Sequence, residues 1–143
     1  MRIFLAVFIF IFSVCAGAQS EEEIYKEAMQ YVTDNQELVF AISFIFNAST
    51  KLKYCGSRFA SELSDVEVAY GKFNKWIKSL DDEMDTPVER MVLTEFRVDA
   101  EGAAMKNIEE RMVLQACESL VRLAKQEKLP PKVIAVLNGL EKA

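Results

Sequence analysis

The sequence predicts an all-α protein, a small antiparallel bundle of five or six helices with one disulfide. Three observations lead to this fold class. Apolar residues recur at steps of three and four along most of the chain, which is the spacing of one helix face. Ser, Thr or Asp followed three residues later by Glu, the capping-box pattern, precedes several of these stretches. No segment combines β-branched alternation with the Gly-rich two-residue turns that indicate a β-hairpin.

The N-terminus has the layout of a secretory signal peptide. Arg2 supplies a positive charge, residues 3–14 are apolar except for Ser13, and Ala16-Gly17-Ala18 fits an Ala-x-Ala cleavage site. We expect cleavage after Ala18, so that residues 19–143 form a single helical domain that is periplasmic or secreted.

Two alternatives to cleavage stay open. A retained membrane anchor would need about twenty apolar residues, and this segment is shorter and is followed by Glu21-Glu22-Glu23. Lipidation would use Cys15, but Val14 stands where lipoprotein signals carry a small residue.

The charge of the mature chain argues against a nucleic-acid partner. Loss of Arg2 leaves 16 Lys and Arg against 22 Asp and Glu, a net charge of −6. Binding to a phosphate backbone depends on clustered Lys and Arg. The chain is also long enough for one domain to bury a real core.

The cysteines predict a disulfide between Cys55 and Cys117. Cys15 leaves with the signal peptide, and an even pair in an oxidising compartment indicates a cross-link. The alternative is two separate buried thiols, since Cys is also a common core residue.

Capping residues and apolar stripes place the first three helices. The first is expected over residues 21–33 after Ser20, with an apolar face of Ile24, Tyr25, Ala28, Met29, Tyr31 and Val32. The second follows the Asp34/Glu37 box over residues 35–54, with Gly56 as its C-terminal stop. Its run from Leu38 to Phe46 is apolar on all sides, so periodicity does not distinguish helix from strand there. The third follows the Ser64/Glu67 box and carries the stripe Val66, Ala69, Phe73, Trp76, Ile77 and Leu80.

The second half of the chain is organised in the same way. Thr86-Pro87 with Glu89 is the strongest start signal, combining an N-cap, Pro at the first helical position and the box carboxylate. This helix either continues into the next or breaks between Asp99 and Gly102. A helix over residues 103–127 places Met105, Ile108, Met112, Ala116, Leu120 and Leu123 on one stripe, widened by Val113, Cys117, Val121 and Ala124. The last helix starts at Pro130-Pro131.

The residue types restrict the chemistry open to this chain. It has no histidine, which removes the commonest general base near neutral pH and the usual ligands of zinc, copper and haem. The acidic residues lie at capping boxes, on solvent faces or in one charged cluster, and none interrupts an apolar stripe where burial would raise its pKa. We therefore expect no enzyme activity, no cofactor and no metal.

The charged cluster Asp81, Asp82, Glu83 and Asp85 is the candidate surface for binding a partner. Its alternating acidic positions resemble the start of a calcium loop, but Thr86 stands at the sixth position instead of Gly and Val92 at the twelfth instead of Glu. We interpret it as a solvated charged segment. Asn47-Ala48-Ser49 matches a glycosylation sequon but falls inside an expected helix, which argues against modification.

The leading hypothesis is an exported, non-enzymatic protein that binds another protein, as immunity and inhibitor proteins of this size and format do. The acidic surface leads us to expect a basic partner. One alternative is a carrier that holds a small apolar ligand among its aromatic side chains, although such residues at helical spacing usually form core. Another is a hydrolase of cell-wall or extracellular polysaccharide that uses only carboxylates.

Overall fold

The computed structural model describes residues 20–103, 110–126 and 129–140. The described chain forms six helices and no strand, which confirms the all-α fold class. The helices are α2 (Glu21–Asp34), α3 (Gln36–Phe59), α4 (Val66–Glu83), α5 (Pro87–Gly102), α6 (Glu110–Gln126) and α7 (Pro131–Leu140). The expected signal peptide, residues 1–18, lies outside the described part.

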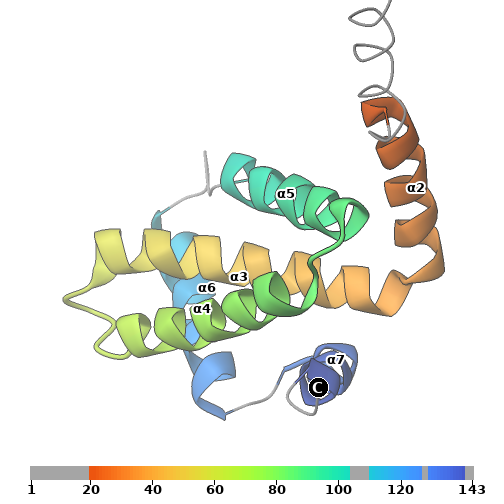
Figure 1. The fold of residues 1–143 in the computed structure, drawn as a ribbon. Helices are drawn as coiled ribbons and strands as arrows, with labels where there is room; N and C mark the ends of the chain where they lie inside the picture. The colour runs from red at the N-terminus through yellow and green to blue at the C-terminus, as the bar shows by residue number, and fades with distance from the viewer. Residues whose placement is uncertain (1–19, 104–109, 127–128, 141–143) are drawn as a thin grey trace, which may run out of the picture.

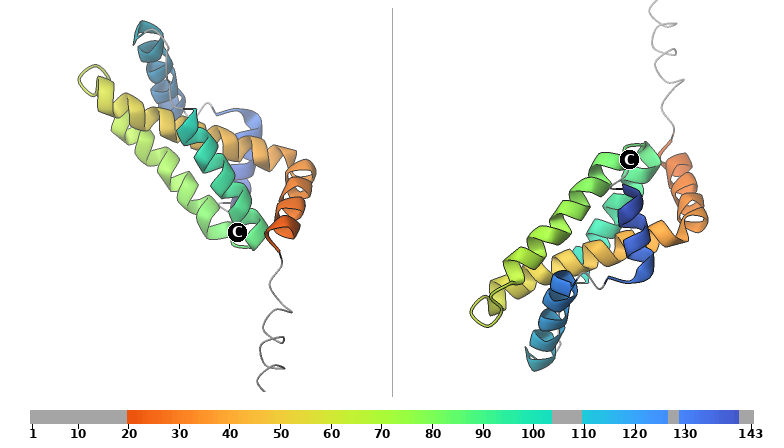
Figure 2. Two further views of the ribbon diagram at one scale, coloured as in Figure 1. Left: turned by 90° about the horizontal axis from the view of Figure 1, so that it is seen from above. Right: turned by 90° about the horizontal axis from the view of Figure 1, so that it is seen from below.

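Helix α3 is the centre of the fold (Figure 1). It packs against α4 and α5, and α4 runs opposite to both α3 and α5. Helix α5 covers one side of the α3/α4 pair, whereas α6 and α7 cross the other side (Figure 2). Helix α2 crosses one end of the group and packs on α5. The bundle is thus antiparallel at its core and crossed at its margins.

The central position of α3 explains why its sequence shows no polar face at its start. Its buried residues are Ala41, Ile42, Ile45, Phe46, Ala48, Ser49, Leu52, Cys55 and Phe59. All five other described helices contact it, so it is covered on most sides. Ser49 is the one polar residue in this set. Its hydroxyl donates to Asn74 Oδ1 at 2.9 Å, so the buried hydroxyl has a hydrogen-bond partner.

Two of the four predicted capping boxes form. The side-chain oxygens of Ser20 and Thr86 accept the backbone N–H groups of Glu23 and Glu89, and both carboxylates reach back to the cap. The box predicted at Ser64 is wrong, because α4 is preceded by Asp65, which makes no side-chain cap bond.

The box predicted at Asp34 is also wrong. Asn35 stands at this helix start, and its amide donates to the carbonyl of Tyr31 at 2.9 Å. The residue therefore closes α2 and leaves α3 without a side-chain cap. Only Asn35 separates α2 from α3, so one residue stands at the end of the first helix and at the start of the second.

Helix α3 continues past the predicted stop at Gly56 and ends at Phe59. Gly56 lies against α4, where a β-carbon would stand 3.8 Å from Val66 Cγ1. Phe59 and Leu63 are buried beyond it, with 4% and 8% exposed. Packing of this last turn on α4 outweighs the weak helix propensity of glycine.

The two alternatives for residues 99–102 are resolved in favour of an end to the helix. Helix α5 ends at Gly102, and α6 runs in another direction (Figure 2). Residues 104–109 and 127, which belong to the helix expected over 103–127, lie outside the described part. Within α6 the buried residues are Val113, Cys117, Val121 and Ala124. The predicted main stripe was wrong in this helix, because Met112 is 58% exposed and the flanking set faces the core.

Candidate functional site

The Cys55–Cys117 disulfide is present and joins α3 to α6. The S–S distance is 2.10 Å and the Cα atoms are 5.7 Å apart, within the usual range for a disulfide. Both residues are fully buried, with 0% exposed. The cross-link therefore lies in the core, as expected from the inward position of Cys117.

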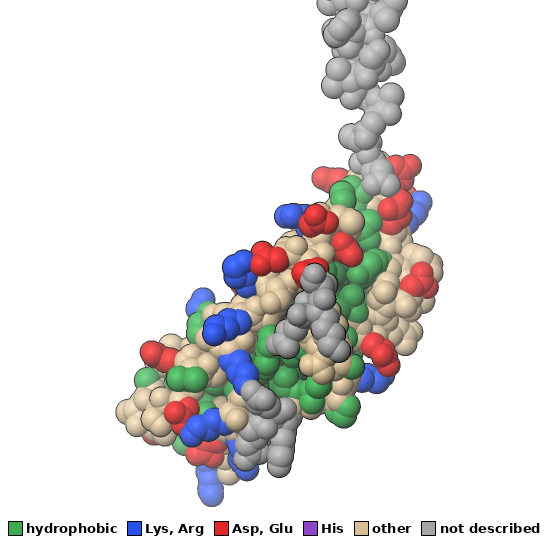
Figure 3. All heavy atoms as spheres, turned by 60° about the horizontal axis from the view of Figure 1, so that its bottom comes forward, with side chains coloured by type: hydrophobic (Ala, Val, Ile, Leu, Met, Phe, Trp, Pro, Cys, Tyr) green, Lys and Arg blue, Asp and Glu red, His purple; other side chains and the backbone are tan. Residues whose placement is uncertain are grey.

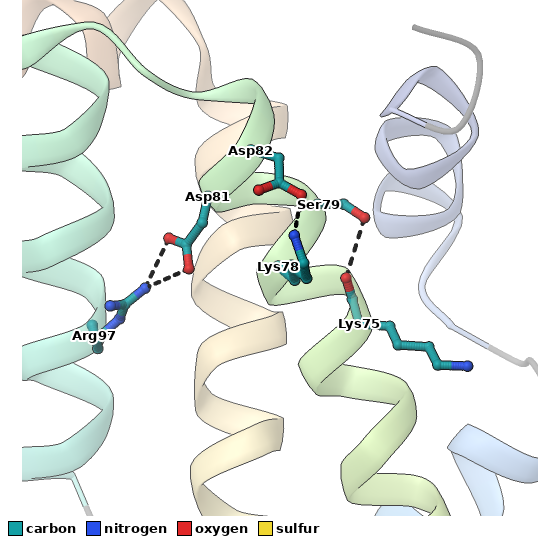
Figure 4. Close-up of polar contacts among 6 residues, drawn as sticks. All are labelled: Lys75, Lys78, Ser79, Asp81, Asp82 and Arg97. Carbon is teal, nitrogen blue, oxygen red and sulfur yellow. Dashed lines mark hydrogen bonds and ion pairs between the residues drawn. The ribbon is translucent and has the colours of Figure 1, made fainter.

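The acidic cluster of residues 81–85 is exposed, but two of its four carboxylates are ion-paired with neighbouring side chains. Arg97 on α5 donates to both carboxylate oxygens of Asp81 at 2.8 and 3.0 Å. Lys78 pairs with Asp82 at 2.6 Å, one turn away on α4. Figure 4 shows the two carboxylates turned to these separate cations. Half of the predicted cluster is therefore already neutralised by neighbours, although exposed pairs of this kind are weak.

Glu83 and Asp85 are the two members left without a cationic partner among the described residues. Between them Met84 is 4% exposed and anchors the segment to the core. The backbone carbonyl of Asp85 accepts the Arg90 Nε–H at 2.9 Å, which orders the turn into α5. Within the described ranges no group of three Asp, Glu, Cys or His side chains is placed to hold a metal ion.

A second exposed surface lies on α2, where sequence analysis expected core. Ala28 is buried as predicted, but Tyr25 and Met29 are 55% and 54% exposed. They stand one helical turn apart, so they share one face. The sequence of α2, EEEIYKEAMQYVTD, contains five acidic residues and one lysine. This lysine, Lys26, pairs with Glu22 at 3.1 Å. We define Tyr25, Met29, Glu21 and Glu22 as the α2 face. An exposed apolar stripe and a buried one have the same periodicity in the sequence. Only the tertiary structure shows that Tyr25 and Met29 belong to an exposed stripe.

The hydrogen bond from Tyr31 to Glu89 places α2 beside the start of α5. The phenol oxygen lies 3.3 Å from Glu89 Oε1. Partial burial, followed by the nearby Glu89 carboxylate, raises the pKa of Tyr31 above its ordinary value. Helix α5 directly follows residues 81–85, so helix α2 and the acidic segment occupy the same end of the molecule. In Figure 3 acidic side chains gather at the upper end of this face of the protein.

Three aromatic residues, Phe44, Phe73 and Trp76, pack on one another. The Phe73 and Trp76 rings meet edge to face at 4.9 Å, and Phe44 lies 6.2 Å from Phe73. Phe73 is fully buried. Beside this cluster a groove of about 530 Å³ opens between α4 and α7, lined by Val68, Gly71, Lys72, Lys75, Trp76, Ser79 and Leu137.

The sequon residue Asn47 lies inside α3, as expected. It is half-buried, and its amide nitrogen, the atom that would carry a glycan, donates to the carbonyl of Ser43 at 2.8 Å. Asn47 therefore does not lie in an exposed loop of the kind that is usually glycosylated.

Comparisons with protein-family models, curated proteins and solved structures found no match to this chain. Among the described residues, none of the helices has the length and apolar character needed to cross a membrane.

Proposed function

We propose that this protein is exported and acts without catalysis by binding a basic partner protein through its acidic end. The observation that carries the proposal is the α2 face, where a tyrosine and a methionine are exposed on a helix that carries five acidic residues. Residues 81–85 extend the same acidic end through Glu83 and Asp85.

The chemistry of the α2 face suits a protein interface. Tyrosine and methionine are enriched in interface cores, and tyrosine is frequent among the residues that dominate binding energy. A rim of like charge attracts a partner of opposite sign and speeds their encounter at low salt. An acidic rim around two apolar anchors therefore favours a basic protein surface.

The disulfide supports export, because such bonds persist in oxidising compartments. It also joins α3 to α6, so the surface helices rest on a cross-linked core. Immunity and inhibitor proteins, which neutralise an effector by covering its active site, are the class that we consider first.

Affinity capture with paired variants tests this proposal. The tagged protein is recovered from the exported fraction at low and high salt, and any captured protein is identified and titrated against purified variants. We expect the Y25A/M29A double variant to weaken binding by about tenfold or more, as truncation of interface anchors does. A matched control is V98A/M112A, which removes apolar side chains that are 60% and 58% exposed elsewhere.

A second variant pair examines the charged segment. E83Q/D85N should slow association and reduce its salt dependence, because it removes steering charge. D82N is the control, since Lys78 already neutralises this carboxylate. Capture that is equally strong in Y25A/M29A and in the control, and insensitive to salt, would overturn the proposal.

A further inference from the structure

We propose that the groove between α4 and α7 binds a single-chain amphiphile with an anionic head group. This site is separate from the acidic end described above and does not depend on the proposed function. Three features carry the inference: an apolar floor, a rim of lysines, and a volume that matches a small ligand.

The floor of the groove is apolar and open. Trp76 from α4 and Leu137 from α7 both line it, with Leu137 only 6% exposed, and Val68 lines it with 73% of its surface exposed. Gly71 adds no side chain, and a β-carbon there would have no atom within 4 Å. The helix surface is therefore bare where a chain could lie against it.

Lysines on α4 supply the rim. Lys72 Nζ donates to the carbonyl of Ala124 at 3.2 Å and lies 5.9 Å from the centre of the Trp76 ring, so its ammonium is held at the groove wall. The neighbouring Lys75 extends toward α7, and no contact is drawn to its ammonium (Figure 4). Among the described residues no carboxylate pairs with Lys75, in contrast to Lys78, which pairs with Asp82.

The charge of this rim is opposite to that of the whole protein, which carries a net −5. In Figure 3 Lys and Arg side chains line one border of the hydrophobic area on this face. An anion placed beside Lys75 would gain a charge-assisted hydrogen bond, while its chain would cover Val68 and Trp76. A neutral chain would gain only the second contribution, and a cationic amphiphile would be repelled.

The dimensions favour a single chain. The groove of about 530 Å³ adjoins a hollow of about 240 Å³ that shares Val68 and Lys72 with it. Pockets for small molecules commonly hold roughly 300 to 1,000 Å³. The smaller hollow is also lined by Asp65, whose carboxylate pairs with Lys125 at 2.6 Å, so the larger groove is the part that suits an anionic ligand.

Trp76 is the only tryptophan of the chain, so its fluorescence reports directly on the groove. The purified protein is titrated with dodecanoate below its micelle concentration, and in parallel with dodecyltrimethylammonium and dodecyl maltoside. We expect a saturable change in Trp76 emission with dodecanoate and a weaker response to the other two. Equal responses to all three amphiphiles, or a response only to vesicles that contain anionic lipid, would overturn the proposal.

Matched lysine variants locate the head group. K75Q should raise the dissociation constant about fivefold, the effect of one charge-assisted contact at a partly exposed site. K78Q, the same change one turn along α4 on an ion-paired lysine, should leave it within about twofold. V68E places a carboxylate at the exposed edge of the groove and should also weaken binding, while circular dichroism checks that the helices remain. Identical affinities for K75Q and K78Q would contradict the assignment.

Discussion

Tyr31 donates a hydrogen bond to Glu89, so the carboxylate that caps helix α5 also fastens helix α2 to it. The other oxygen of Glu89 accepts from the Thr86 hydroxyl at 2.7 Å and from its backbone N–H at 3.2 Å. Glu89 therefore both caps the start of α5 and makes a tertiary contact with α2. Through this side chain helix α2 is held beside the start of α5.

Replacing Glu89 should cost more stability than replacing the equivalent residue of the other capping box. E89A loses the contacts to Thr86 and the bond from Tyr31, and we expect the free energy of unfolding to fall by about 2 kcal/mol. E23A loses only the local box with Ser20 and should cost about 1 kcal/mol. Urea unfolding of both variants measures the difference.

A double-mutant cycle measures how much of the stability lost in E89A comes from the contact with Tyr31. Y31F removes the phenol donor, and the coupling between Y31F and E89A should be about 1 kcal/mol. Strictly additive effects would show that the two side chains act independently.

The raised pKa of Tyr31 predicts a loss of stability at alkaline pH. The unfolded chain releases this proton near the ordinary value of 10.0, whereas the folded protein retains it to higher pH. The contribution of Tyr31 is therefore complete below pH 10.0 and declines as the pH rises through the raised pKa. Denaturation measured across the alkaline range should show a shallower decline in Y31F. Y25F, on the exposed side of the same helix, is the control and should keep the decline of the parent protein.

The disulfide should account for a large share of the stability. It closes a loop with a sequence separation of 62 residues, and the chain-entropy treatment assigns such a loop roughly 4 kcal/mol. We expect C55A/C117A to lower the free energy of unfolding by about this amount in denaturant titrations. Thiol labelling of the denatured, unreduced mature protein should find no free cysteine. Two reactive thiols would show that the bond does not form.

The sequence predicted the fold class because its main signals were local and strong. The Thr86-Pro87 start and the Ser20 cap depend on residues within one turn, and the structure confirms both. Pairing of Cys55 with Cys117 followed from the exclusion of Cys15 and needed no knowledge of topology. The stripe from Val66 to Leu80 was read correctly because α4 has one buried side.

The errors arose where tertiary packing decides between equivalent local patterns. Met112 and Val113 both continue an apolar repeat along α6, but only Val113 faces the core. Tyr25 and Met29 were placed inside because the wide apolar face of α2 suggested more cover than one neighbouring helix provides. For the candidate site the sequence indicated four acidic residues, and it could not show that Arg97, sixteen residues from Asp81, neutralises one of them.

Gly56 offers a direct test of the longer helix α3. If the residue is interior to a helix and not its stop, G56A should stabilise the protein by about 0.5 to 1 kcal/mol, because alanine favours the helix and restricts the unfolded chain. The added β-carbon would meet Val66 Cγ1 at 3.8 Å, an ordinary packing distance. G71A is the matched control on α4, where the new methyl group has no neighbour within 4 Å and only the helix propensity changes. A gain in G71A together with a loss in G56A would place the end of α3 at Gly56, because an alanine there would then be forced into a backbone conformation that glycine alone adopts readily.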